Sequence, residues 1–217
     1  MKFFLNILNI TAIFLISLFL IITSVFWYFG KDLPNFEQLS DYEPPIVSRI
    51  FASDGNFLEE YSRENRIFSS FEHFPKNLVH CFLVAEDTNF YSHVGFDLKS
   101  IMRAFVKNIS NIFNSRRPEG ASTITQQVAK NFLLSGEISY SRKIKEIILS
   151  LRIENILSKN EILELYLNEI YLGNRSFGVS AASINYFNKS LHELNIEEMA
   201  LLAALPKAPS TYNPFVN

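Results

Sequence analysis

The sequence predicts a mainly α-helical domain with a small β hairpin at its entrance, preceded by one N-terminal transmembrane helix. An apolar run at residues 3–30 predicts the membrane helix. Apolar residues at helical spacing recur from residue 75 onward, and two strand-like segments flank a turn within 46–61. The chain has 217 residues, so the part beyond the apolar run has the length of one domain. We therefore divide the chain into a stub and anchor (1–30), a linker with the hairpin (31–74) and a main domain (75–217).

The run at residues 3–30 carries no charged side chain and is rich in Phe, Leu and Ile. A helix crosses the bilayer core with about 20 apolar residues, so this run is long enough to span it. Trp27 and Tyr28 suit the headgroup zone, where an amphipathic ring keeps one edge in water. The alternative is a cleaved signal peptide, which has a shorter apolar core and a cleavage site of small residues. The length of the run and its Val-Phe-Trp-Tyr-Phe ending favour an uncleaved signal-anchor.

Charges that flank the run favour a cytoplasmic N-terminus and an exported body. Lys2 and the amino terminus are positive on one side, whereas Lys31 is balanced by Asp32 on the other. The single cysteine, Cys81, cannot form an internal disulfide, which fits an extracytoplasmic protein built without such bridges. Its place in an apolar helical pattern predicts buried filler rather than a nucleophile.

The segment between the anchor and the main domain contains prolines and then a hairpin signal. A poorly periodic, proline-containing stretch at 31–48 predicts a linker leaving the membrane. Strand-like residues at 46–51 and 56–61 flank Ser-Asp-Gly at 53–55, a turn sequence typical of a β hairpin.

Helical patterns cover most of the chain from residue 74. Leu78, Phe82 and Ala85 form the stripe of a first helix that leads directly to Glu86. The next predicted helix is capped by Asp97 and has the apolar stripe Ile101, Phe105, Ile109 and Ile112. A further helix starts at Thr123, and another is opened by Ser139 or Ser141 and runs to Ile156. The last three are one capped by Asn160 that runs to Gly173, one at 178–187 and one at 196–205. Turn and charge residues at 114–120 predict a loop.

A polar cluster at residues 86–95 interrupts the apolar pattern. Neighbouring residues on a helix project about 100° apart, so Glu86 and Asp87 cannot both serve one reacting atom. One carboxylate should face a cleft while the other holds local structure. Taken alone, such a pair is more often a solvated helix end. His93 alone is more often structural, Phe90 is most simply a packing residue, and Gly95 permits a backbone angle that a side chain would forbid.

A second polar segment starts a helix that suits an anion. Free backbone N–H groups and the helix dipole at this start favour a negative group, and Lys130 follows. The polar side chains at the start are Ser122, Thr123, Thr125, Gln126 and Gln127. The simpler interpretation is a well-capped helix, because Thr123 and Gln126 have capping-box spacing.

A third segment combines bases with an acid. Arg142 and Lys143 precede Glu146, and the i, i+4 spacing of Arg142 and Glu146 also allows an ordinary surface ion pair. Basic residues gather between 100 and 146, and for most of them a solvated helix face is the better interpretation. Asn168 follows an apolar helix and is interpreted as a polar fastener.

Five strings in this chain, in order, resemble the signature motifs of the peptidoglycan glycosyltransferases, glycosyltransferase family 51. Residues 86–95 match Glu-Asp-x-x-Phe-x-x-His-x-Gly without a gap, and residues 120–127 match the second motif with Gly-Ala where Gly-Gly is usual. Residues 142–146 match Arg-Lys-x-x-Glu. Residues 162–168 and 204–210 resemble the fourth and fifth motifs.

The resemblance implies a lysozyme-like helical fold with a cleft at the membrane surface. It implies a peptidoglycan glycosyltransferase that polymerises lipid II into β-1,4 glycan strands with inversion, releasing undecaprenyl pyrophosphate. In this reading Glu86 is the general base and Glu146 the second active-site carboxylate. The residues implied in binding substrate and pyrophosphate are Ser122, Thr123, Gln126, Gln127, Lys130, Arg142 and Lys143, and the supporting residues are Asp87, Phe90, His93, Gly95 and Asn168.

The resemblance also implies the surroundings of the enzyme. No cofactor and no protein-bound metal are required, although a divalent cation, Mg²⁺ or Mn²⁺, is compatible with the pyrophosphate. The expected partners are lipid II, undecaprenyl-linked glycan, the membrane and cell-wall elongation or division proteins. The net charge of −2 gives no general attraction to nucleic acid. The expected location is the bacterial inner membrane, single-pass, with a cytoplasmic N-terminus and a periplasmic catalytic domain.

Two other functions stay open. One is a membrane-anchored lytic glycosidase, which needs an acid/base carboxylate but no basic groups for pyrophosphate. The other is a non-catalytic remnant or scaffold. The hairpin resembles that of bifunctional class A penicillin-binding proteins, and no Ser-x-x-Lys, the transpeptidase nucleophile motif, occurs here. We therefore expect an N-terminal portion that lacks the last helices of the domain and the transpeptidase domain.

Overall fold

The computed structural model describes residues 2–31, 33, 48–51, 53, 57–61, 65–113, 119–133 and 139–215. Most of the predicted linker at 31–48 lies outside the described residues. So do the Asp54–Gly55 part of the predicted turn and most of the predicted loop at 114–120.

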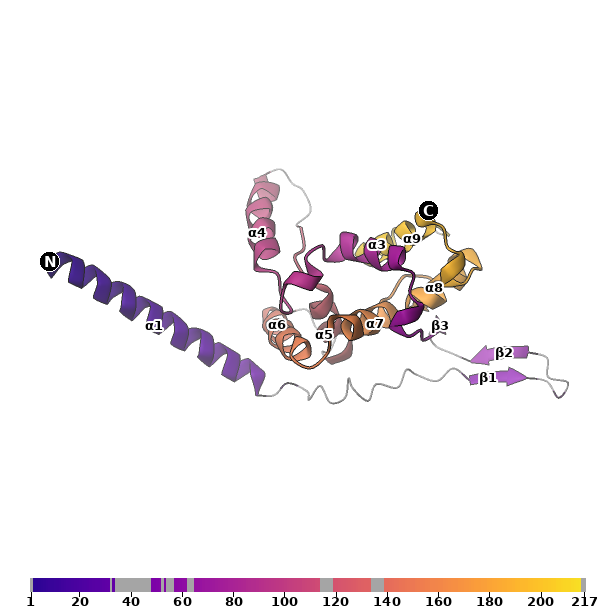
Figure 1. The fold of residues 1–217 in the computed structure, drawn as a ribbon, viewed down its shortest axis with the longest axis horizontal. Coiled ribbons are helices and arrows are strands. Elements are labelled where there is room, and N and C mark those ends of the chain that lie inside the picture. Colours follow the sequence, from indigo (N-terminus) through magenta and orange to yellow (C-terminus); the bar gives the residue numbers. More distant parts are fainter. Residues whose placement is uncertain are drawn as a thin grey trace.

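The N-terminal helix α1 (Lys2–Gly30) projects from the body of the molecule (Figure 1). Within the described part of the chain it is the one helix long and apolar enough to cross a membrane, over Asn6–Gly30. Its far end meets the body, where the Arg152 guanidinium donates a hydrogen bond of 2.9 Å to the carbonyl oxygen of Gly30. A candidate membrane span is therefore joined directly to the helical domain.

Two small sheets follow. Strands β1 (Ser48–Phe51) and β2 (Phe57–Tyr61) pair antiparallel, with Ser48 opposite Tyr61 and a register shift near Phe51, so the predicted hairpin is confirmed. Strand β3 (Asn65–Arg66) pairs parallel with β4 (Ser176–Phe177), a pairing that was not predicted. This second sheet ties the entrance of the domain to its C-terminal half.

Helices make up most of the domain, and the predicted fold class is confirmed. The α-helices are α3 (Lys76–Glu86), α4 (Leu98–Phe113), α5 (Ile124–Leu133), α6 (Tyr140–Glu154), α7 (Lys159–Glu169), α8 (Val179–Phe187) and α9 (Ile196–Ala204). Short 3₁₀ turns are η1 (Phe71–His73), η2 (Phe90–Ser92), η3 (Leu191–Glu193) and η4 (Leu205–Lys207). Helix α3 packs on α9, and α5 packs against α6 and α7.

Two predicted caps are confirmed. Asp97 Oδ1 accepts hydrogen bonds from the backbone N–H groups of Lys99 and Ser100 at the start of α4. Thr123 and Gln126 bond reciprocally at the start of α5, each side chain accepting from the other's backbone N–H. Both caps satisfy N–H groups that a helix start leaves unpaired.

The ends of α6 and α7 differ from the prediction. Helix α6 ends at Glu154, before Ile156, and α7 ends at Glu169, well before Gly173. The cap of α7 is Ser158 rather than Asn160, because Ser158 and Glu161 form a complete capping box. That box satisfies two donors at once, which a cap at Asn160 would not do.

The core is continuous across the helices. Its largest fully buried side chains are Tyr166, Phe82, Phe90, Leu78, Ile124, Leu149, Ile153, Ile162, Leu163, Leu167, Leu172 and Leu202. Cys81 is partly buried against this core, as expected of filler. Ala85, predicted for the buried stripe of α3, is exposed instead.

Helix α4 stands apart from the other helices (Figure 1). Its predicted stripe faces outward, with Phe105 61 % and Ile112 76 % exposed, whereas Ala104 on another face is buried. The polar face turns inward instead, where Asn108 holds both backbone groups of Glu119 through its side-chain amide. The molecule therefore carries an apolar surface on α4 that its own core does not cover.

Candidate active site

Glu86 is the last residue of α3 and is half-buried at the edge of the core. Phe82, one turn earlier on the same face, is fully buried and fixes that face against the domain. The side-chain amide of Gln127, on α5, donates a hydrogen bond of 2.7 Å to Glu86 Oε2. The structure thus brings together one predicted carboxylate and one predicted binding residue.

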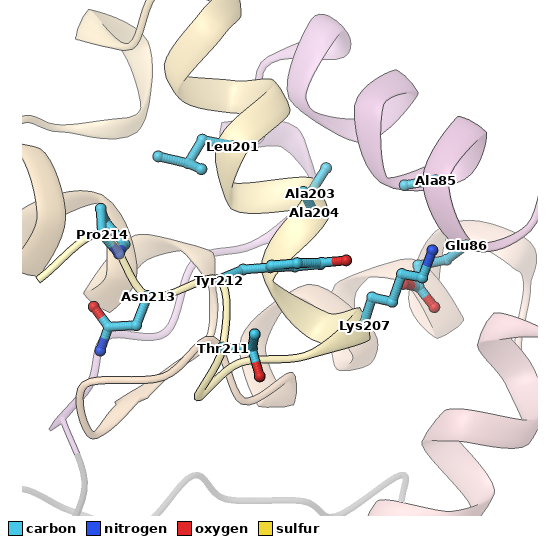
Figure 2. Close-up of a pocket in the computed structure, with 10 residues that line it drawn as sticks. All are labelled: Ala85, Glu86, Leu201, Ala203, Ala204, Lys207, Thr211, Tyr212, Asn213 and Pro214. Atoms are coloured by element: carbon cyan, nitrogen blue, oxygen red, sulfur yellow. The ribbon is translucent and has the colours of Figure 1, made fainter. Parts of the chain in front are cut away.

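Glu86 lies where two cavities meet. One cavity, of about 680 Å³, is lined by residues of α3, α9 and the segment from η4 to residue 214, and Figure 2 shows Tyr212 and Lys207 extending into it. The other, of about 720 Å³, is lined mainly by polar groups of α3, α4 and the start of α5. Both cavities share Ala85, Glu86, Lys207 and Tyr212. A single carboxylate therefore faces two spaces of different character.

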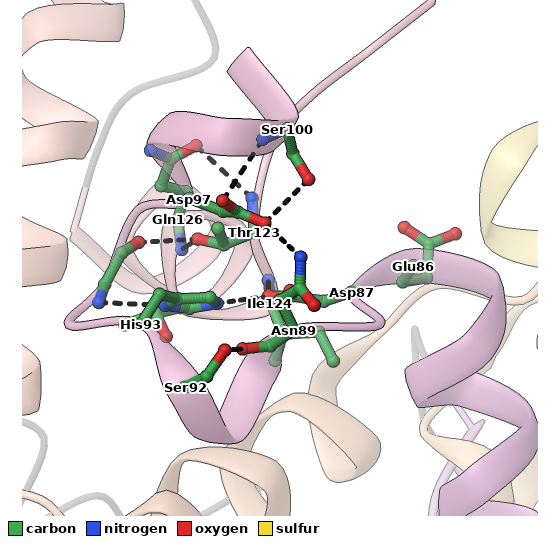
Figure 3. Close-up of polar contacts among 12 residues, drawn as sticks. Glu86, Asp87, Asn89, Ser92, His93, Asp97, Ser100, Thr123, Ile124 and Gln126 are labelled. Carbon is green, nitrogen blue, oxygen red and sulfur yellow. Dashed lines mark hydrogen bonds and ion pairs between the residues drawn. The ribbon is translucent and has the colours of Figure 1, made fainter. Parts of the chain in front are cut away.

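Asp87 turns away from Glu86 and is buried. Its Oδ2 accepts hydrogen bonds from His93 Nε2 (2.9 Å) and from the backbone N–H of Ile124 (3.0 Å), the first residue of α5. The backbone N–H of Gly95 donates to His93 Nδ1, so the hydrogen-bond network assigns the ring proton to Nε2. Figure 3 shows the Glu86 carboxylate standing apart from this network. Asp87 therefore joins the end of α3 to the start of α5, which carries Gln127 to Glu86.

The loop after Asp87 is clamped onto α6. Gly95 has φ +102°, and a Cβ added there would lie 2.8 Å from the carbonyl group of Ser150. Thr123 Oγ1 donates a hydrogen bond of 2.6 Å to the Gly95 carbonyl oxygen. Phe90 is fully buried and meets the His93 ring edge-on, with ring centroids 6.0 Å apart. Glycine is needed at this position because a side chain would collide with the α6 backbone.

Three further residues support the far side of this loop: Thr125, from the predicted polar helix start, and Glu154 and Lys159, which were not predicted. Lys159 Nζ donates to the His93 carbonyl oxygen (2.8 Å) and to Glu154 Oε1 (2.7 Å). The same Glu154 oxygen accepts from Thr125 Oγ1 at 2.7 Å, and Lys159 Nζ lies 4.4 Å from the centroid of the Phe90 ring. Little in the sequence indicated this group of contacts, because Thr125, Glu154 and Lys159 lie on three different helices.

Glu146 is the centre of a second polar cluster. It is only 4 % exposed, and its two oxygens meet Arg142 Nε at 3.2 Å and Lys143 Nζ at 2.9 Å. Lys143 Nζ also donates to Ser122 Oγ (2.8 Å) and Gln126 Oε1 (3.2 Å). Of these residues Ser122 lines the larger cavity, and Lys143 reaches the cavity wall through its bond to Ser122. Five predicted site residues are brought together here.

Two predicted residues lie elsewhere. Lys130 is exposed on the last turn of α5 and is absent from the linings of both cavities. Asn168 is buried on α7, where its side chain accepts from the backbone N–H of Ser69 (2.9 Å) and donates to the Ser69 carbonyl oxygen (2.8 Å). It fastens the entrance segment rather than meeting Glu86.

Further polar groups line the cavities without having been predicted as site residues. Arg103 and Asn111 of α4 line the larger one, and their helical spacing with Ser100 could have indicated a common face. Glu119 accepts from Lys107 Nζ at 2.8 Å. This hydrogen bond and the nearby cations hold the pKa of Glu119 below its usual value. Within the described residues, no group of three or more His, Cys, Asp or Glu side chains could hold a metal.

The sequence is similar to that of known proteins over most of its length. A family model described as transglycosylase matches residues 54–217. The chain is 53 % identical to penicillin-binding protein 1A of Rickettsia prowazekii over 193 residues, 89 % of this chain and 24 % of that protein. It is 44 % identical to penicillin-binding protein 1A of Pseudomonas aeruginosa over 195 residues, 90 % of this chain and 23 % of that protein.

The chain thus spans about a quarter of the length of these curated relatives. Among solved structures, penicillin-binding protein 1A from Haemophilus influenzae aligns with a TM-score of 0.40 and 29 % identity, covering 81 % of this chain and 16 % of that one. The family model covers most of the sequence, including every segment that builds the two cavities. The chain belongs to the transglycosylase family.

Proposed function

We propose that this chain is a peptidoglycan glycosyltransferase that polymerises lipid II into β-1,4 glycan strands, with inversion and release of undecaprenyl pyrophosphate. One observation carries the proposal: the Glu86 carboxylate lies at the junction of two cavities and is held there by Gln127. A transfer between two sugars needs both reacting centres beside one base, whereas a hydrolase needs only water as its second reactant. Membership of the transglycosylase family supports the same class of chemistry.

In this mechanism Glu86 takes the proton from the acceptor's 4-hydroxyl as that oxygen attacks the anomeric carbon of the donor. A base within hydrogen-bond reach of the attacking hydroxyl lowers the barrier. Inversion follows from a single displacement, so no glycosyl-enzyme forms. Asp87 and His93 keep α3 and α5 in register, and the direction of the Glu86 carboxylate depends on that register.

The leaving pyrophosphate needs charge compensation more than a proton, because its own proton affinity is low. Lys143 and Arg142 at the cavity edge supply positive charge, and Glu146 holds both in place. Lys130 is a further cation for this role only if substrate reaches the last turn of α5. The mechanism is also compatible with a divalent cation at the pyrophosphate, where oxygens of the substrate would be among its ligands.

The apolar surfaces of the chain fit a substrate held in a membrane. Lipid-linked sugars lie within a short distance of the bilayer surface, and a tethered enzyme searches that surface rather than a volume. Helix α1 would be the tether, with its N-terminus in the cytoplasm and the cavities outside the inner membrane. The exposed face of α4 would rest in the interface. Cell-wall elongation or division proteins are the expected protein partners.

The test is polymerisation of fluorescent lipid II by this chain, with and without moenomycin, an inhibitor of the family. Polymer whose formation moenomycin blocks is the expected result. Cleavage of preformed glycan would instead favour a lytic glycosidase. Binding of lipid II without any product would favour a non-catalytic remnant.

The Glu86→Gln variant tests the base. The amide keeps the shape of the side chain but accepts no proton, so polymerisation should fall at least a hundredfold. Thermal unfolding should stay close to that of the wild type, because Glu86 is half-buried at the edge of the core. A folded Glu86→Gln protein that polymerises lipid II at the wild-type rate would remove Glu86 from the mechanism.

A further inference from the structure

Tyr166 on α7 is buried with an unpaired hydroxyl. The side chain is 1 % exposed, and its hydroxyl oxygen has no hydrogen-bond partner among the described residues. A buried polar group without a partner destabilises a fold, and native proteins keep few of them. Phenylalanine would fill the same space without this penalty. The hydroxyl therefore calls for an explanation other than packing.

Two observations relate Tyr166 to Glu86. The Tyr166 ring meets the Phe82 ring edge-on, with centroids 6.1 Å apart, and Phe82 precedes Glu86 by one turn on the same face of α3. Burial, and after it the charges of Glu86 and Asp87, raise the pKa of Tyr166 well above its usual value. Both carboxylates are thus within electrostatic reach of the phenol.

The two carboxylates have room for another donor. Gln127 donates to Oε2 of Glu86, and both hydrogen bonds to the Asp87 side chain fall on its Oδ2. Because its pKa is raised, Tyr166 keeps its proton throughout the neutral range and remains a donor. The Tyr166 hydroxyl can therefore donate, and the two carboxylates can accept. A hydrogen bond in a buried position is stronger than one in water.

Resting on the proposed role of Glu86 as base, we propose that Tyr166 is a positioning residue whose hydroxyl donates a hydrogen bond to the Glu86 carboxylate through one water molecule. With Gln127 as the other donor, the carboxylate plane is fixed from two sides and its remaining lone pairs face the cavities.

The test uses Tyr166→Phe, which removes one oxygen and keeps the ring. The side-chain carboxyl of Glu86 is titrated by NMR in protein with isotope-labelled glutamate, and Glu86→Gln identifies its resonance. The midpoint should move up by about one pH unit in Tyr166→Phe, because the bond to the ionised form is lost. The other charged groups around Glu86 are unchanged in this variant, namely Asp87, His93, Lys207, Arg103 and Glu119. An unchanged midpoint overturns the proposal, whether or not the chain polymerises lipid II.

Kinetics and stability give the second readout. Tyr166→Phe should lower kcat about tenfold, leave KM within about twofold and move the acidic limb of the rate profile to higher pH. Its melting temperature should stay close to that of the wild type, because the variant keeps the ring and its packing in the core. Wild-type kcat and an unshifted rate profile in Tyr166→Phe would contradict the positioning role. An inactive wild-type chain would count against the proposed function, and the titration would still decide on Tyr166.

Tyr186→Phe is the matched control. The Tyr186 hydroxyl donates a hydrogen bond of 2.9 Å to the Leu172 carbonyl oxygen, and Tyr186 lines neither cavity. This variant should therefore lose stability without moving the Glu86 midpoint. A shift of the midpoint in Tyr186→Phe as large as in Tyr166→Phe would show that the effect is not specific and would overturn the proposal.

Discussion

At the scale of single residues, Asp97 shows how a buried carboxylate organises one wall of the larger cavity. Its Oδ2 accepts hydrogen bonds from Asn89 Nδ2 and Ser100 Oγ, each 2.7 Å long, while its Oδ1 accepts from the two backbone N–H groups that it caps. These bonds, that from Asn89 first, hold the pKa of Asp97 well below its usual range. Such a group contributes stability that is complete above its unfolded pKa of about 3.9 and is lost as pH falls toward the folded pKa.

Asp97→Asn should therefore cost about 1–2 kcal/mol of stability at pH 7, because asparagine still caps the helix but makes the other hydrogen bonds without a charge. The difference in stability between wild type and variant should shrink as pH falls below about 4. Below that pH the Asp97 carboxyl group of the unfolded wild-type chain binds a proton, which stabilises the unfolded state relative to the folded one. Melting temperatures measured from pH 3 to pH 7 check this. Glu72→Gln, which changes an exposed carboxylate, should stay within about 0.5 kcal/mol of the wild type. A constant gap for Asp97→Asn across this range would contradict the assignment.

How far single residues could be predicted depends on where their partners lie. Glu86 and His93 belong to one short string, so their pattern is visible in the sequence alone. Glu154 and Lys159 were missed because their partners lie on other elements, and for the same reason Thr125 was assigned to the polar helix start without its bond to Glu154. Helical periodicity assigns a residue such as Tyr166 to the core but says nothing about which groups surround its hydroxyl. The surroundings of such residues depend on which elements pack together in the fold, and a local pattern in the sequence does not give that.

At the scale of elements, α4 is the informative exception. A stripe of apolar residues normally turns toward the core, and the existence and length of this helix followed from that stripe. Its direction did not follow, because it depends on bonds to neighbouring segments: Asp97 accepts from Asn89 of the preceding loop, and Asn108 bonds the backbone of Glu119 after the helix. The ends of α6 and α7 were also misjudged, since neighbouring Ser and Asn residues compete as caps and only the bonded pair shows which one is used.

Spin labels can test whether this face of α4 enters the lipid interface. In a Cys81→Ser background, a nitroxide at Ile112→Cys should be more accessible to oxygen than to a water-soluble nickel complex when the protein is in vesicles. Ile184→Cys on α8 is a control, since its side chain is also exposed, at 45 %, and it should show the opposite preference. Equal access of the nickel complex to both positions would show that α4 stays in water.

At the scale of the whole molecule, the end of helix α1 contacts the helical domain. Gly30 at the end of α1 is buried, and a Cβ there would lie 3.2 Å from the Arg152 guanidinium, which also bonds the Gly30 carbonyl oxygen. The sequence predicted the anchor and the hairpin because both are local patterns. It did not predict the β3–β4 pairing, since two-residue strands far apart in sequence leave no periodic signal.

Thiol labelling tests the proposed orientation of α1 in the membrane. In the Cys81→Ser background, Glu197→Cys at an exposed position of α9 should react with a membrane-impermeant reagent in spheroplasts. A cysteine inserted between Met1 and Lys2, which keeps the charge of Lys2, should react only after the membrane is opened. Labelling of this cysteine in intact spheroplasts, with protection of Glu197→Cys, would reverse the orientation.

The wall common to the two cavities has a thermodynamic consequence. Lys207 and Tyr212 belong to both linings, so a ligand that moves either side chain in one cavity reshapes the other. Occupancy of the two spaces is then linked, and linkage is reciprocal: each ligand changes the affinity of the other by the same factor. An inhibitor that fills one cavity acts at the same time as an effector of its neighbour, and its measured affinity depends on whether that neighbour is full.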